Sequence, residues 1–192
     1  MRRIIAVLII SAIPVTAAYG DGIVNPDFDG TIGSPPAAPW VSNGPVQIWF
    51  SSNDPGSNSQ VARLGLGAGN VASLSQDFAC GAPTPDKVCN VTLWYVWTPG
   101  AADPNLDEVF EILDGNTVLF SRTIADGFIP FTPLGLGFGE CGAQTLSFRI
   151  SDPSDNNIES WAWVDYLTCS CDGPIATDQS TWGQIKALYQ AP

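Results

Sequence analysis

The sequence predicts an all-β fold, an antiparallel β-sandwich for which jelly-roll topology is favoured. The chain consists of many short apolar runs separated by clusters of Gly, Pro, Asn and Asp. No window between residues 19 and 175 shows a long apolar period of 3.6 residues, so no long helix is expected there. Many short strands without helices between them pair antiparallel and stack in two layers.

Nine strands are expected, over residues 47–50, 61–66, 72–78, 91–98, 108–113, 117–123, 128–134, 145–150 and 160–168. The segments between them, such as SSNDPGSNS and SDPSDNN, have the composition of turns. Asp114-Gly115-Asn116 lies between two apolar runs and predicts a hairpin. Residues 172–192 are expected to form a linker and a short C-terminal helix, because Thr181 and Gln184 have the spacing of a capping box.

The first 18 residues have the pattern of a signal peptide. Two arginines precede the apolar run Ile4–Val15, and small residues follow it. This run of 12 residues is shorter than the roughly 20 that span a bilayer. We therefore expect a secreted or cell-surface protein that leaves the membrane after cleavage, with one β-sandwich domain over residues 19–171.

Composition excludes several classes of function. Without Arg2 and Arg3, five basic residues face 19 acidic ones, so the net charge is 5 − 19 = −14. Such a charge repels nucleic acid and anionic membranes, and it is compatible with calcium or neutral ligands such as sugars. Because the chain has no histidine, the usual Ser-His-Asp and Cys-His mechanisms and His-containing zinc sites are excluded. A hydrolase would depend on carboxylates, with Asp107, Glu108 and Glu111 as candidates.

Five cysteines in an exported chain predict two disulfides and one free thiol. Cys80 and Cys89 flank a Pro-rich loop and are expected to form one bridge. Cys141 then pairs with Cys169 or Cys171. Those two cysteines share a face of a strand, so both cannot reach Cys141.

Several motifs occur in a characteristic order along the chain: NPDFDG, Trp40, SQVARLGLG, SLSQDF, TLWYVW, DEVFEILDGNTVLF, TLSFRI and WAWVDYL. This order resembles bacterial galactose-binding-like jelly rolls, including carbohydrate-binding modules of families 4 and 9. The resemblance covers about residues 23–168 and implies the fold, whereas the ligand varies within such folds. It also implies a structural calcium beside the first and last strands, held by Asp29 and Asp165 with help from Asn25 or Asp27. The second aspartate of the family pattern is Tyr166 here.

Alternation along the strands predicts a binding face. The inner faces are expected to carry Leu93, Tyr95 and Trp97, then Leu146, Phe148 and Ile150, then Ala62, Leu64 and Leu66, and finally Ala162, Val164 and Tyr166. The outer face is expected to carry Trp94, Arg63, Arg149, Trp161 and Trp163. Tryptophan rings stack on sugars and arginines bind hydroxyl groups. The sequence therefore predicts a non-catalytic carbohydrate-binding module. The alternatives are a structural or adhesive protein that binds an extracellular protein, and a carboxylate-only glycoside hydrolase.

Overall fold

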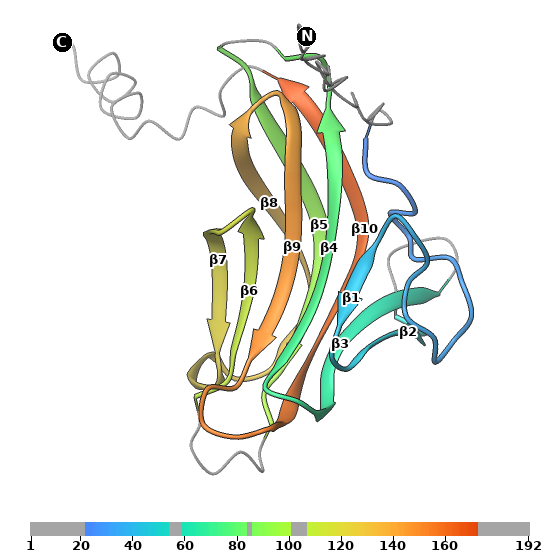
Figure 1. The fold of residues 1–192 in the computed structure, drawn as a ribbon, viewed down its shortest axis with the longest axis vertical. Helices are drawn as coiled ribbons and strands as arrows, with labels where there is room; N and C mark the ends of the chain where they lie inside the picture. Colours follow the sequence, from blue (N-terminus) through green and yellow to red (C-terminus); the bar gives the residue numbers. More distant parts are fainter. Residues whose placement is uncertain (1–21, 54–58, 84–85, 101–106, 173–192) are drawn as a thin grey trace, which may run out of the picture.

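A computed structural model of the chain shows an antiparallel β-sandwich (Figure 1). The structure describes residues 22–53, 59–83, 86–100 and 107–172. The expected signal peptide and C-terminal helix lie outside these residues. Within them, no helix has both the length and the apolar character needed to cross a membrane.

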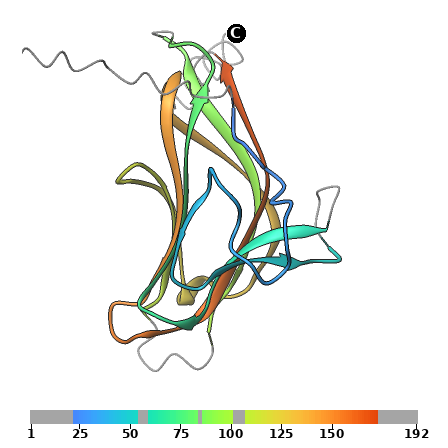
Figure 2. The same cartoon turned by 45° about the vertical axis from the view of Figure 1, so that its right-hand side comes forward.

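Two sheets of five strands each make up the described sandwich, and all nine expected strands are present. The first sheet has the order β1 (Val41–Asn43), β4 (Val71–Cys80), β9 (Gly142–Ser151), β6 (Val109–Asp114) and β7 (Thr117–Thr123). The second has the order β2 (Val46–Phe50), β3 (Gln60–Ala68), β10 (Asn157–Asp172), β5 (Val88–Thr98) and β8 (Ile129–Glu140). A short 3₁₀ turn, η1 (Ile124–Asp126), connects the first sheet to β8. Figure 2 shows β2 and β3 reaching out beside the long strands.

The core lies between the sheets, where the predicted apolar faces meet. Tyr95 and Trp97 of β5 are buried against Phe110 of β6, with ring centroids 6.2 and 6.0 Å apart. The chain before β1 adds Phe28 and Trp40 to the core, with ring centroids 5.1 Å apart. The predicted inner faces of β5 and β9 are therefore confirmed.

Two expected core residues are exposed, because the strand pairing slips next to them. Leu66 is 50% exposed and Tyr166 is 46% exposed. Both have positive φ, 57° and 50°, which turns their side chains away from the sandwich. The β3–β10 pairing shifts between Ile158 and Trp161, and the β5–β10 pairing shifts between Asp165 and Thr168. Each shift is a β-bulge, in which one extra residue changes which side chains face inward.

One of the two expected disulfides is present and the other is not. Cys141 is bonded to Cys171, and their Cα atoms are 5.8 Å apart, a usual separation for a disulfide. Cys80, Cys89 and Cys169 are thiols, so the expected Cys80–Cys89 bridge is not formed in this structure. Cys80 ends β4 in the first sheet and donates to the Ser170 carbonyl at 3.1 Å, while Cys89 lies on β5 opposite Cys171. The observed bond ties the turn between β8 and β9 to the end of β10.

Candidate functional site

An aromatic groove lies on the outer face of the second sheet. It has a volume of about 380 Å³ and is lined by Asn53, Val96, Phe128, Pro130, Phe131, Trp161 and Trp163. These residues are far apart in sequence and meet because β10, β5 and β8 are neighbours in the sheet. We call this set of residues the aromatic groove.

The two tryptophans of β10 lie side by side in the aromatic groove. Trp161 and Trp163 are two residues apart on one strand, so they share a face, and their ring centroids are 4.7 Å apart. Phe131 of β8 packs against Trp163 at 5.9 Å. Phe128, just before β8, is 63% exposed. The aromatic groove therefore presents several ring faces within reach of one ligand.

Hydrogen-bond donors lie next to these rings. Arg63 of β3 is directly opposite Trp163 in the sheet, and its guanidinium lies 4.1 Å above the ring of Trp49 on β2. Burial lowers the pKa of Arg63, which remains cationic at neutral pH because its ordinary pKa is so high. Trp163 Nε1 and Arg63 Nε are buried and have no partner among the described residues. Buried donors are normally paired, so each of these two N–H groups needs a partner that the described residues do not supply.

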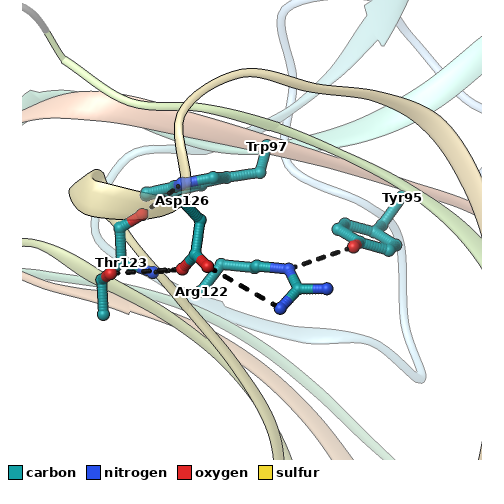
Figure 3. Close-up of polar contacts among 5 residues, drawn as sticks. All are labelled: Tyr95, Trp97, Arg122, Thr123 and Asp126. Carbon is teal, nitrogen blue, oxygen red and sulfur yellow. Dashed lines mark hydrogen bonds and ion pairs between the residues drawn. The ribbon is translucent and has the colours of Figure 1, made fainter.

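A set of polar contacts holds the turn that precedes the aromatic groove (Figure 3). Trp97 Nε1 donates to the Thr123 carbonyl at 3.0 Å, and Arg122 Nε donates to the Tyr95 hydroxyl at 3.3 Å. Asp126 Oδ2 accepts the Thr123 amide at 2.7 Å, and this hydrogen bond is the main reason that the pKa of Asp126 is lowered. Because η1 ends two residues before Phe128, these contacts fix the start of β8.

The structure brings together three of the five predicted ligand-binding residues. Trp161, Trp163 and Arg63 are neighbours on the second sheet. Trp94 points to the same side of that sheet, opposite Pro133 of β8, but it does not line the aromatic groove. Arg149 lies on β9 of the first sheet, where it forms an ion pair of 2.6 Å with Glu111. A single binding surface that includes Arg149 is therefore wrong, because alternation distinguishes inner from outer faces but not one sheet from the other.

Phe128 and Phe131 belong to the aromatic groove but were not among the predicted site residues. Their segment was expected to be a strand, and two phenylalanines near its start were the available signal. Their partnership with Trp163 depends on the pairing of β8 with β5, which the sequence does not reveal.

The segment that contains Asn25 and Asp29 lies next to the part of β10 that contains Asp165. Asn25 and Asp29 close a turn, in which Asn25 Oδ1 accepts the Asp29 amide at 2.8 Å. The Pro26 carbonyl in that turn accepts the Leu167 amide at 3.3 Å, two residues beyond the fully buried Asp165. The first segment and the last strand therefore lie side by side, as the resemblance implies. Calcium binding there stays a prediction.

The carboxylates considered for hydrolysis have structural partners. Glu108 is fully buried, and its two oxygens accept the amides of Glu159 and Ser160 at 2.7 and 2.8 Å. Glu111 is paired with Arg149. Asp107 hydrogen-bonds Ser154. None of the three lines the aromatic groove.

Comparison with known proteins identifies the fold. No protein-family model matches the sequence, and no curated protein is significantly similar to it. Among solved structures, the chain is similar to a cleaved adhesin domain of Lys-gingipain from Porphyromonas gingivalis, with 12% identity and a TM-score of 0.50 over 77% of this chain and 96% of that one.

Two further solved structures are similar. An arabinose-bound α-L-arabinofuranosidase has 12% identity and a TM-score of 0.51 over 80% of this chain, which spans 26% of that enzyme. The carbohydrate-binding module TmCBM61, in complex with β-1,4-galactotriose, has 13% identity and a TM-score of 0.49 over 79% of this chain and 94% of that one. The matches to the adhesin domain and to the arabinofuranosidase show the fold alone, which is an antiparallel β-sandwich of jelly-roll type, as expected.

Proposed function

We propose that this protein is a secreted, non-catalytic module that binds carbohydrate in the aromatic groove. The observation that carries the proposal is the pair of tryptophan rings, 4.7 Å apart, beside the phenylalanines of β8. Sugars present apolar C–H faces and polar edges. Ring faces next to the exposed Asn53 amide and the partly exposed Arg63 suit both kinds of surface. Secretion is inferred from the first 18 residues of the sequence alone.

Aromatic and polar groups at the aromatic groove are expected to bind different parts of a sugar. Trp161 and Trp163 are expected to stack on sugar rings, while Arg63 and the Asn53 amide bind hydroxyl groups. With a net charge of −14 after cleavage, a neutral or cationic glycan is favoured over an acidic one. The shared fold supports no particular sugar, because one fold hosts many ligands.

A second candidate is adhesion to an extracellular protein. It is favoured by the strong exposure of Phe128, 63%, at the edge of a mainly apolar groove. An exposed aromatic side chain on a surface of this kind is typical of an anchor in a protein interface.

A glycan array with the purified mature protein tests the proposal, followed by calorimetry on any sugar found. Replacing Trp161 or Trp163 with Ala is expected to weaken binding roughly 10- to 100-fold. The reason is that covering a large apolar side chain contributes about 1.5–3 kcal/mol, and each 1.4 kcal/mol is tenfold in affinity. Trp94→Ala is the matched control, since it removes a tryptophan from the same sheet face outside the aromatic groove.

The outcomes separate the candidates. Loss of sugar binding in Trp163→Ala with retention in Trp94→Ala supports the aromatic groove. Absence of binding across a broad glycan panel, with an intact fold, favours adhesion to a protein. Equal loss in all three variants would refute the groove as the specific site.

A further inference from the structure

Three carboxylates from both sheets converge at the end of the sandwich where β9 runs into β10. Glu108 lies just before β6, Asp152 just after β9, and Glu159 near the start of β10. Each offers one oxygen, and these three oxygens lie within 4.8 Å of one another. Glu108 is fully buried and Asp152 is 1% exposed, whereas Glu159 is partly exposed, so two of the three carboxylates are shielded from solvent.

The hydrogen bonds around the cluster leave specific oxygens without donors. Asp152 Oδ1 accepts the amides of Ser154 and Asp155 at 2.9 and 3.2 Å, but the buried Oδ2 has no partner among the described residues. Glu159 Oε1 accepts from the Asn157 side chain, and its Oε2 is likewise buried without a partner. A buried carboxylate oxygen without a donor is costly, and two such oxygens beside a third carboxylate repel each other.

No basic residue compensates Asp152 or Glu159 in the described structure. The two ion pairs found among those residues join Arg122 to Asp126 and Arg149 to Glu111. A bound cation would therefore compensate the negative charge of Asp152 and Glu159 and coordinate their unpaired oxygens.

We propose that Glu108, Asp152 and Glu159 bind a calcium ion that joins the two sheets. Calcium prefers carboxylate oxygens at about 2.3–2.6 Å, so oxygens around one ion lie up to about 5 Å apart. The spacing within 4.8 Å fits that sphere. Calcium takes six to eight ligands, and water or nearby carbonyls complete the shell. This site differs from the one expected at Asp29 and Asp165, because Glu159 and Asp165 are six residues apart on β10, about 20 Å along a strand.

Calcium titration of the full chain, stripped with a chelator, tests the proposal. Calcium is expected to raise the melting temperature, since an ion that binds only the folded state stabilises it by mass action. Terbium is a second probe, because Trp161, two residues from Glu159, can sensitise its emission. Asp152→Asn keeps the side-chain shape and the Oδ1 acceptor, and removing its charge is expected to weaken calcium binding at least about tenfold.

Further variants keep the test decisive. Glu159→Gln replaces Asp152→Asn if the latter fails to fold, because Glu159 is partly exposed. Asp77→Asn is the matched control, because Asp77 is an exposed carboxylate on β4 outside this cluster, and it should bind calcium like the unmodified chain. Asp29→Asn tests the separate site predicted at Asp29 and Asp165. Calcium binding that survives Asp152→Asn and Glu159→Gln but is lost in Asp29→Asn would overturn the proposal. A melting temperature and terbium emission that are unchanged by metal would do so as well. Neither result bears on the aromatic groove.

Discussion

Replacing both Cys141 and Cys171 with Ala should destabilise the fold by about 3.6 kcal/mol. The bond closes a loop of 30 residues, from the turn after β8 to the end of β10. In the chain-entropy model, the cross-link lowers the entropy of the unfolded chain by about 2.1 + 1.5R ln 30, roughly 12 cal/mol/K, which is about 3.6 kcal/mol at 25 °C. For a domain of this size, each 1 kcal/mol shifts the melting temperature by about 2–4 °C, so a drop of about 7–14 °C is expected.

Urea unfolding measured in parallel on the variant and the unmodified chain gives the difference directly. Cys169→Ala is the matched control, since it removes a partly buried thiol from the same face of β10 and should cost less than about 1.5 kcal/mol. Peptide mapping under non-reducing conditions checks that no other bridge has formed. A double variant within about 1 kcal/mol of the unmodified chain would refute this account of the bond. A Cys169→Ala variant as unstable as the double variant would refute the pairing itself.

Three more predictions follow from local geometry. Alkylation in denaturant should modify three cysteines. In the folded protein Cys169 should react slowly at pH 8, because burial and the neighbouring Cys80 raise its pKa to about 11. Fast labelling of folded Cys169, detected by mass spectrometry, would contradict this. The pKa of Asp126 is lowered from 3.8, so its contribution to stability is present above about pH 4 and is lost as the pH falls through the folded pKa. The difference in melting temperature between the unmodified chain and Asp126→Asn should therefore shrink in acid. A difference that stays constant with pH would argue against this contribution. Gly65→Ala would place a Cβ 2.2 Å from the Ser160 carbonyl oxygen at φ +89°, and it should lower the free energy of unfolding by at least about 2 kcal/mol. Gly33→Ala is the control and should cost less, because Gly33 has a similar φ of +84° but open space around it. Equal losses of stability in urea unfolding would show that the clash at Gly65 is relieved.

The strands were predictable because alternation and turn composition are local signals. The expected 117–123 strand has the observed bounds of β7, and Gly115-Asn116 forms the predicted turn between β6 and β7. The missed strand, β1, has only three residues, too few for alternation to be visible. Ends of strands were less predictable, since β8 and β10 extend beyond their apolar runs through pairing with their neighbours.

Two of the seven residues that line the aromatic groove could be predicted for the same reason. Alternation places Trp161 and Trp163 on an outer face, which depends on one strand alone. Adding Phe131 and excluding Arg149 requires the strand order, which depends on how the whole chain packs. The carboxylates of Glu108, Asp152 and Glu159 meet through the packing of one sheet end against the other, and 51 residues separate the first of them from the last.

The bulge between Asp165 and Thr168 explains how β10 contributes side chains to both the aromatic groove and the disulfide. At the start of β10, Trp161 and Trp163 face outward while Ala162 packs in the core. A regular strand would keep that alternation and turn Cys171, an odd-numbered residue like the tryptophans, outward as well. The extra residue between Asp165 and Thr168 reverses the alternation, so Leu167 is buried and Cys171 packs against the core, where it reaches Cys141. Because a shift of one residue exchanges the two faces of a strand, the bulge lets the same strand present aromatic rings outward at one end and a cysteine inward at the other.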